Sequence, residues 1–143
     1  MSSAALLDSI WRLLANDPAF LAFKGLAPTS PIEDRADYIQ KEEETEGIVD
    51  ANTIPICLLF VRPGKFDHRS SQVYISKAVI ECYAHDGNTA RKMAEHTMGL
   101  MQNWQPDGLP SFVCRLAYDT SFKTGIPGVK GHRIYYDVSY YVG

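Results

Sequence analysis

The sequence lacks any long apolar run. None of its hydrophobic stretches approaches the roughly 20 residues that a helix needs to cross a bilayer, so no membrane span is expected. The first residues, 1–5, also lack the basic region and the cleavage site of a signal peptide. We therefore expect a protein that is made in the cytoplasm and that has no membrane among its partners.

Cysteine is scarce and poorly spaced for metal binding. The chain contains three, Cys57, Cys82 and Cys114, without the Cys-x-x-Cys pair with which zinc sites usually begin. Each cysteine lies in an apolar segment, and free cysteine is among the most buried residue types. An odd number of cysteines also suits a reducing compartment. The sequence therefore predicts buried free thiols and no metal site.

Catalytic signatures are missing as well. The chain has no Gly-x-Ser-x-Gly and no His-Glu-x-x-His, and the glycine-rich stretch 125–131 lacks the Gly-Lys-Ser/Thr ending of a phosphate loop. The histidines are scattered over a turn, a helix entry, a helix and a strand start: His68, His85, His96 and His132. We predict no catalytic residue, no cofactor and no enzymatic activity.

An excess of positive charge is also absent. The net charge is −3 at pH 7, and residues 33–50 hold eight acidic and two basic residues, so this segment carries −6 and the remainder +3. Nucleic-acid binding proteins need a basic surface that displaces counterions from phosphates, which excludes a general grip on DNA or RNA. A divalent-cation site in the glutamate run is the less favoured interpretation, because consecutive acids on a loop do not define one site.

The sequence does contain enough apolar residues for a hydrophobic core: 45% of its 143 residues are hydrophobic. We therefore predict one domain that spans residues 1–143. Apolar residues at helical spacing predict a helix over about 3–15. Pro18 begins a short second helical piece that Gly25 ends. The segment of about 26–53 has no sustained period and is predicted to be an acidic loop, with one helical turn from Tyr38 to Glu44 as an option.

The rest of the chain alternates between strand and helix signals. Strands are predicted over about 54–61, 73–84, 112–118 and 132–142. Between the second and third, Asp86 or Asn88 caps an amphipathic helix whose methionine stripe is expected to face the core. Residues of about 119–131 are predicted to form a long, mildly basic loop. The expected fold is α+β, in the order N-terminal helix, β-hairpin, helix, β-hairpin, with a mainly antiparallel four-stranded sheet packed against the helices.

The order of these motifs carries a family resemblance. An amphipathic N-terminal helix is followed by the strand Ile-Pro-Ile-Cys-Leu-Leu-Phe, and Val-Ile-Glu-Cys-Tyr-Ala-His then leads directly into the helix Asn-Thr-Ala-Arg-Lys-Met-Ala-Glu. The chain closes on the strand Tyr-Tyr-Asp-Val-Ser-Tyr-Tyr. This arrangement, which spans nearly the whole chain, resembles the tail terminator (tail completion) proteins of long-tailed bacteriophages.

The resemblance implies a structural protein of the virion neck, assembled in the host cytoplasm, that forms a homo-oligomeric ring, expected to be a hexamer. Such a ring caps the tail tube protein, stops tail polymerisation and offers the surface that the head connector or head-completion protein joins. DNA passes through its channel without specific binding. Two alternatives stay open. One is another neck component, a head-completion or connector-adaptor protein, and the other is a small-ligand-binding α+β domain with the methionine stripe and Cys82 lining a pocket.

Three groups of residues are predicted to serve this function. Sheet edges and exposed aromatics such as Tyr135 and Tyr141 supply subunit contacts. The loop 119–131, through Lys123 and Lys130, docks on the tail tube. An acidic run faces the channel, where its negative charge repels the DNA that passes through and prevents the DNA from binding. That run consists of Glu42, Glu43, Glu44 and Glu46.

Overall fold

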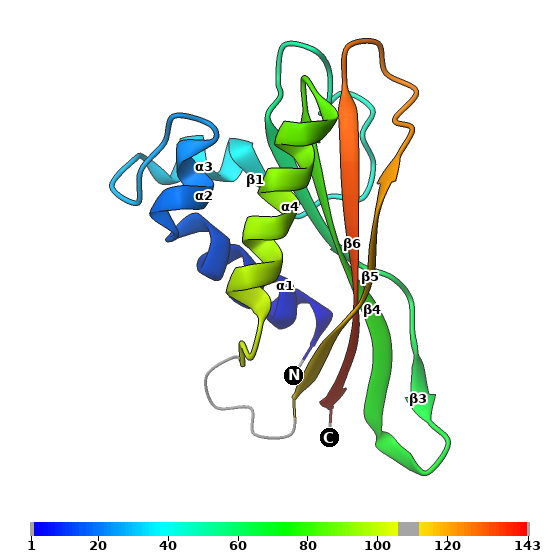
Figure 1. The fold of residues 1–143 in the computed structure, drawn as a ribbon. Coiled ribbons are helices and arrows are strands. Elements are labelled where there is room, and N and C mark those ends of the chain that lie inside the picture. The colour runs from blue at the N-terminus through cyan, green and yellow to red at the C-terminus, as the bar shows by residue number, and fades with distance from the viewer. Residues whose placement is uncertain (1, 106–111, 143) are drawn as a thin grey trace.

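The computed structural model describes residues 2–105 and 112–142. Its helices are α1 (Ser3–Ala15), α2 (Pro18–Ala22), α3 (Ile32–Tyr38) and α4 (Gly87–Met101). Its strands are β1 (Ile39–Gln40), β2 (Ile56–Val61), β3 (Lys65–Asp67), β4 (Ser70–Ala84), β5 (Val113–Phe122) and β6 (Lys130–Tyr141). The helices α1, α2 and α4 cover one face of the sheet, as Figure 1 shows with the sheet seen edge-on.

The first two helices form where the sequence predicts them. The Ser2 side chain caps α1 by accepting the backbone N–H of Ala5, and the helix buries an apolar stripe against the sheet. In α2, Pro18 occupies the first turn and the Asp17 carboxylate accepts the N–H of Phe20 at 2.8 Å. The buried stripe of α1 is Leu6, Ile10, Leu14 and Ala15.

The segment 26–53 is not the continuous loop that the sequence predicts. It contains α3, so the chain is helical before Tyr38, and the option of a helical turn after it is wrong. Tyr38 is fully buried, and its hydroxyl donates to the carbonyl of Phe20 at 2.8 Å. The next two residues form β1, and the Trp11 indole N–H donates to the carbonyl of Ile39 at 2.8 Å. Tertiary contacts from α1 and α2 therefore order this segment.

The sheet has the strand order β1-β2-β4-β6-β5, with β3 pairing β4 off this path. β1 runs parallel to β2, and the other pairs are antiparallel. Within the described residues the sheet thus has six strands where the sequence predicts four, although the α+β class is as predicted. The two additional strands, β1 and β3, are only 2 and 3 residues long, which is too short for a periodic signal.

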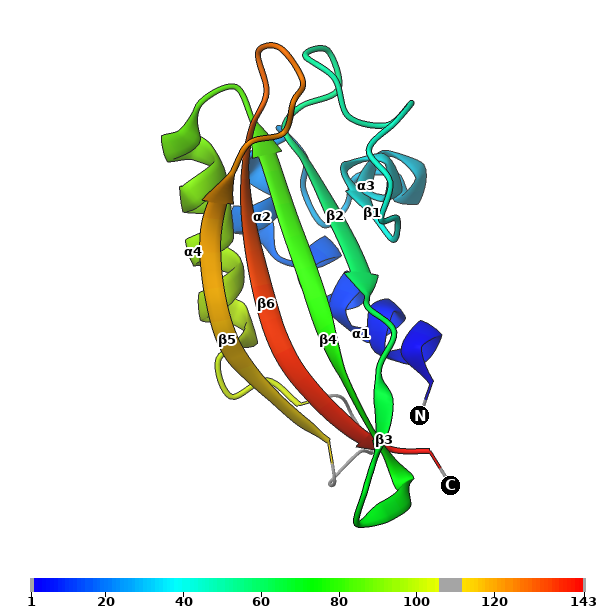
Figure 2. The ribbon, with the colours of Figure 1, turned by 90° about the vertical axis from the view of Figure 1, so that its right-hand side faces the viewer.

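The two faces of the sheet differ in what covers them. Alternate residues of β4, such as Ile80 and Cys82, join the main core beneath the helices, together with Ile134 of β6. We call the opposite side the open face; it carries Val79 and Tyr83, which are also buried. Figure 2 looks onto this open face, with the helices behind the strands.

Two hairpins extend from the sheet. The predicted loop 119–131 is shorter than expected, because β5 continues to Phe122 and β6 already begins at Lys130, which leaves residues 123–129 as the connection. At the other end, β3 and the start of β4 project past the end of β2 (Figure 2). We call this projection, residues 64–75, the arm.

The helix α4 begins at the predicted cap. The Asp86 carboxylate accepts the backbone N–H of Thr89 at 2.7 Å and the Thr89 hydroxyl at 2.9 Å. The face toward the core contains Met93 and Met101, so the prediction of a core-facing methionine stripe is confirmed, with Met98 half-buried at its edge. None of the helices in the described ranges is long and apolar enough to span a membrane.

The cap of α4 predicts a pH dependence. The hydrogen bonds from Thr89 lower the pKa of Asp86, so its charged form stabilises the folded state above the ordinary aspartate range. That contribution is lost as the pH falls through the lowered pKa. We expect Asp86→Ala to lower the unfolding temperature at about pH 7, and the difference from wild type to shrink below about pH 4. Thermal unfolding followed by circular dichroism at several pH values measures this; an equal deficit at every pH would contradict it.

Candidate functional site

The upper half of the open face carries charged residues on buried strands. Glu81 and Tyr83 of β4 alternate with the core residues of that strand, and Arg133 and Tyr135 do the same on β6. Glu81 is only 2% exposed, although charged residues are almost never buried unless they are paired. The upper half of the open face therefore contains a polar site that is part of the buried sheet.

A groove of about 490 Å³ lies over these residues. Its floor is formed by side chains from four neighbouring strands: Phe60, Glu81, Tyr83, Phe122 and Arg133. One wall comes from the segment between β1 and β2, and the other from the start of the connection after β5. The wall residues are Glu43, Glu44, Thr45 and Glu46 on one side and Lys123 and Thr124 on the other, and Arg62, just after β2, also lines the groove. We call this feature the charged groove.

The floor centres on an ion pair across two strands. The sheet register places Glu81 directly opposite Arg133, whose Nε donates to the carboxylate oxygen Oε2. The Tyr83 hydroxyl donates to the other oxygen, Oε1, at 2.9 Å. Burial, followed by the nearby Glu81 charge, raises the pKa of Tyr83, which keeps this hydroxyl protonated. Both oxygens of the buried carboxylate are therefore occupied.

Aromatic rings enclose the arginine of this pair. The Arg133 guanidinium carbon lies 4.0 Å from the centre of the Phe122 ring, and Nη1 lies 3.4 Å from the Tyr135 hydroxyl. Burial alone would lower the pKa of Arg133, but the Glu81 charge and the hydrogen bonds to Glu81 and Tyr135 together raise it. Arg62 stacks nearby, 5.7 Å from the centre of the Tyr135 ring. These contacts make the floor a rigid polar network rather than a set of free reactive groups.

The groove brings together predicted residues that are far apart in the sequence. Glu43, Glu44 and Glu46 share it with Lys123. The remaining members of the predicted sets lie elsewhere. Glu42 lines a hollow beside α3, and Lys130 is exposed at the start of β6, beside the connection 123–129.

The two predicted contact tyrosines differ in exposure. Tyr141 is 45% exposed, but Tyr135 is only 9% exposed, so the prediction that it is an exposed aromatic is wrong. The cause is Tyr118, whose ring stacks on Tyr135 with 4.7 Å between ring centres. A register shift between Leu116 and Tyr118 places the two tyrosines opposite each other. Tyr118 itself is 52% exposed, and the sequence analysis missed it as a surface residue.

His132 and the cysteines take structural positions, whereas His68 and His85 are exposed. His132 is 4% exposed and lies between Asp119, at 2.6 Å from Nε2, and Ser121, at 3.2 Å from Nδ1. Cys57 and Cys82 are buried as predicted, whereas Cys114 is half-buried. Burial raises the pKa of the Cys114 thiol to about 12, so it remains protonated at neutral pH. Among the described residues, no three metal-ligating side chains are grouped to hold an ion.

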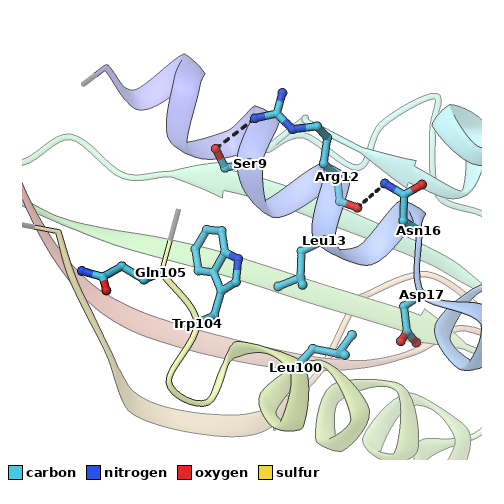
Figure 3. A pocket seen from close by; sticks show the side chains of 8 residues that line it. All are labelled: Ser9, Arg12, Leu13, Asn16, Asp17, Leu100, Trp104 and Gln105. Atoms are coloured by element: carbon cyan, nitrogen blue, oxygen red, sulfur yellow. Dashed lines mark hydrogen bonds between the residues drawn. The ribbon is translucent and has the colours of Figure 1, made fainter. Parts of the chain in front are cut away.

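A second hollow, of about 480 Å³, lies between α1 and the end of α4 (Figure 3). Its polar groups bond to one another: Arg12 donates to the Ser9 hydroxyl at 3.3 Å, and Asn16 donates to the Arg12 carbonyl at 2.8 Å. Asp17 is engaged in the α2 cap and lies 2.6 Å from His96. This hollow therefore presents less unpaired charge than the charged groove.

The sequence matches no known protein family and no curated protein. Among solved structures, the chain is similar to one chain of a structure described as the virion of a native gene transfer agent particle. The TM-score is 0.62, the sequence identity is 9%, and the match covers 98% of this chain and 98% of that chain. The likeness is one of fold. It extends over nearly the whole length of both chains.

Proposed function

We propose that this protein is a structural component of a phage-like virion that forms a ring, caps the tail tube and ends its polymerisation. The observation that carries the proposal is the likeness over 98% of its length to a chain of a gene transfer agent virion. The order of motifs along the sequence supports the more specific role at the tail end. In this role the ring also presents the surface that the head connector or head-completion protein joins.

The edge strand β5 supports an assembly role. It is 10 residues long, lies at one end of the strand order, and exposes Val113, Leu116 and Tyr118 by 41%, 50% and 52%. An open sheet edge with apolar side chains is a template for pairing with another protein. We assign this edge, together with the adjoining connection 123–129, to the contact with the tail tube protein.

The polar network of the groove supports a structural protein rather than an enzyme. Glu81, the buried carboxylate, is held by Arg133 and Tyr83, so it is not available as a general base. The negative net charge supports a channel that DNA crosses without specific binding. The channel-facing role of Glu42, Glu43, Glu44 and Glu46 stays a prediction; Glu43, Glu44 and Glu46 line the charged groove, and Glu42 lines the hollow beside α3.

Electron microscopy of particles assembled without this protein tests the function. Tails of uncontrolled length are the expected result, because nothing would then stop the tube from growing. Heads that leak DNA on tails of normal length would point instead to a head-completion or connector-adaptor protein. Normal particles would contradict both roles.

The tube contact predicts a defect that is separate from folding. Lys123→Glu combined with Lys130→Glu is expected to leave the fold intact and to give overlong or unattached tails under the microscope. Deleting the connection 123–129 is a less suitable test, because its residue Val129 is only 4% exposed and belongs to a buried hydrophobic cluster. Arg91→Glu combined with Lys92→Glu on the exposed side of α4 makes the same charge change and serves as the control. Normal tails from the first variant would contradict the contact.

A further inference from the structure

We infer that the charged groove is the seat for the arm of a second copy of this chain, which makes a head-to-tail contact between neighbouring subunits. The inference rests on the proposed function for the closed ring, and it names the contact from which that ring is built. It follows from the charges of the two surfaces, from their apolar parts and from their separation on the chain.

The groove wall carries negative charge that the chain does not neutralise. Glu43, Glu44 and Glu46 are exposed, and none of them has an ion-pair partner within residues 2–105 and 112–142. The Glu81 carboxylate of the floor is already paired with Arg133. Lys123 on the opposite wall and Arg62 beside the floor offer two positive charges against the three negative ones of this wall. The groove thus presents an acidic wall to whatever enters it.

The arm carries the opposite charge. Lys65 is exposed and has no ion-pair partner among the described residues. Arg69 is 80% exposed and approaches only Asp67, at 3.6 Å, which it shares with His68 at 3.5 Å. Lys65 is thus unpaired within that part of the chain, and the exposed Arg69 can exchange its contact with Asp67 for one with an acidic partner. Complementary charges across an interface steer association and fix its register.

Both surfaces also have an aromatic part. Phe66 at the arm is 51% exposed, and its ring packs edge-on against Tyr74 with 5.3 Å between ring centres. The floor of the groove offers Phe122 and Phe60 beside its ion pair. An aromatic anchor surrounded by charged pairs is the usual composition of a protein interface.

The separation of arm and groove makes the contact intermolecular. On β4, the arm residue Ile75 lies six residues before Glu81, which corresponds to about 20 Å along a strand. Figure 2 shows the arm at the opposite end of the sheet from the connection 123–129. A chain therefore cannot seat its own arm in its own groove. Repeating such a heterologous contact closes a ring when the rotation between copies divides a full turn.

A charge exchange tests the contact. The first variant combines Glu43→Lys, Glu44→Lys and Glu46→Lys, and the second combines Lys65→Glu and Arg69→Glu. Each alone places like charges at every contact, so its self-association is expected to be at least about 100-fold weaker than that of wild type. In an equimolar mixture, each variant's arm meets the other's groove with opposite charge, and the oligomer mass is expected to return. Mass is measured by light scattering, and folding by circular dichroism.

The control makes the same charge change away from the groove, with Glu33→Lys, Asp34→Lys and Asp37→Lys on the exposed side of α3. Its mass is expected to equal that of wild type. If either the groove variant or the arm variant keeps the wild-type mass, the proposed contact is wrong, but the proposed ring is not contradicted. If wild type is monomeric at every concentration, the contact is also wrong, and the microscopy of particles lacking the protein decides the capping role separately.

Discussion

Replacing Arg133 by methionine is expected to lower the free energy of unfolding by about 3–5 kcal/mol. Methionine fills much of the volume but leaves the Glu81 carboxylate, 2% exposed, without its cation. The cost arises because an uncompensated charge in the sheet has neither water nor a partner. For a domain of this size the unfolding temperature should fall by roughly 10 °C. Chemical denaturation and thermal unfolding measure the two quantities.

The same pair of strands supplies a matched control. Lys77 of β4 and Asp137 of β6 are also directly opposite, with 2.5 Å between Nζ and Oδ1, but their side chains are 44% and 59% exposed. Lys77→Met is therefore expected to cost less than about 1 kcal/mol. Combining Arg133→Met with Glu81→Gln should recover most of the loss, since no buried charge then remains. Equal effects at the two pairs would contradict the role of burial.

Replacing Gly64 by alanine is expected to disrupt the base of the arm. A Cβ at this position would lie 2.0 Å from the carbonyl oxygen of Ile75 and 2.6 Å from the Cβ of Ser76. Both are close to the backbone and cannot rotate away, so the strands must separate. The Gly64 N–H, which donates to the Tyr74 hydroxyl at 2.7 Å, would move as well. We expect a loss of at least about 2 kcal/mol of stability. If the arm makes the subunit contact, the oligomer should also be lost.

The control for this change is the same substitution where there is space. Gly99 lies on the exposed side of α4, and a Cβ there meets nothing within 4 Å. Gly99→Ala is expected to stabilise the protein by about 0.5–1 kcal/mol, because alanine favours the helix. The two variants should thus shift the unfolding midpoint in opposite directions. An unchanged midpoint and mass for Gly64→Ala would show that the close approach is not needed.

Local sequence patterns predicted the elements that have their own apolar face. The helices α1 and α4 show helical spacing, and β4 and β6 alternate, so each could be located without knowing its neighbours. The helix α3 buries only Tyr38 and is 7 residues long, so it has no periodic face that the sequence could reveal. The helix α3 is ordered by contacts with α1 and α2, and a local sequence pattern does not include such contacts.

The charged groove shows why the site was predicted only in parts. Glu81 and Arg133 each interrupt an apolar strand, which was visible, but they are 52 residues apart and meet through the β4–β6 register. The hairpin patterns predicted that β2 pairs with β4 and that β5 pairs with β6. They did not predict that β4 pairs with β6, which joins the two hairpins. The burial of Tyr135 depends in turn on the register shift in β5 that places Tyr118 over it.

The two ends of the strand order differ in a way that gives the sheet a direction. β5 leaves 10 residues of edge free, whereas β1 covers the other side with 2 residues and the Trp11 indole occupies the Ile39 carbonyl. A strand added along β5 would meet a continuous edge, whereas one added on the other side would meet β1 and, beyond it, only Leu59, Phe60 and Val61 of β2. In the proposed tail-capping role, a tube that pairs along β5 would not meet an equal edge on the far side of the sheet, so the pairing would not repeat itself.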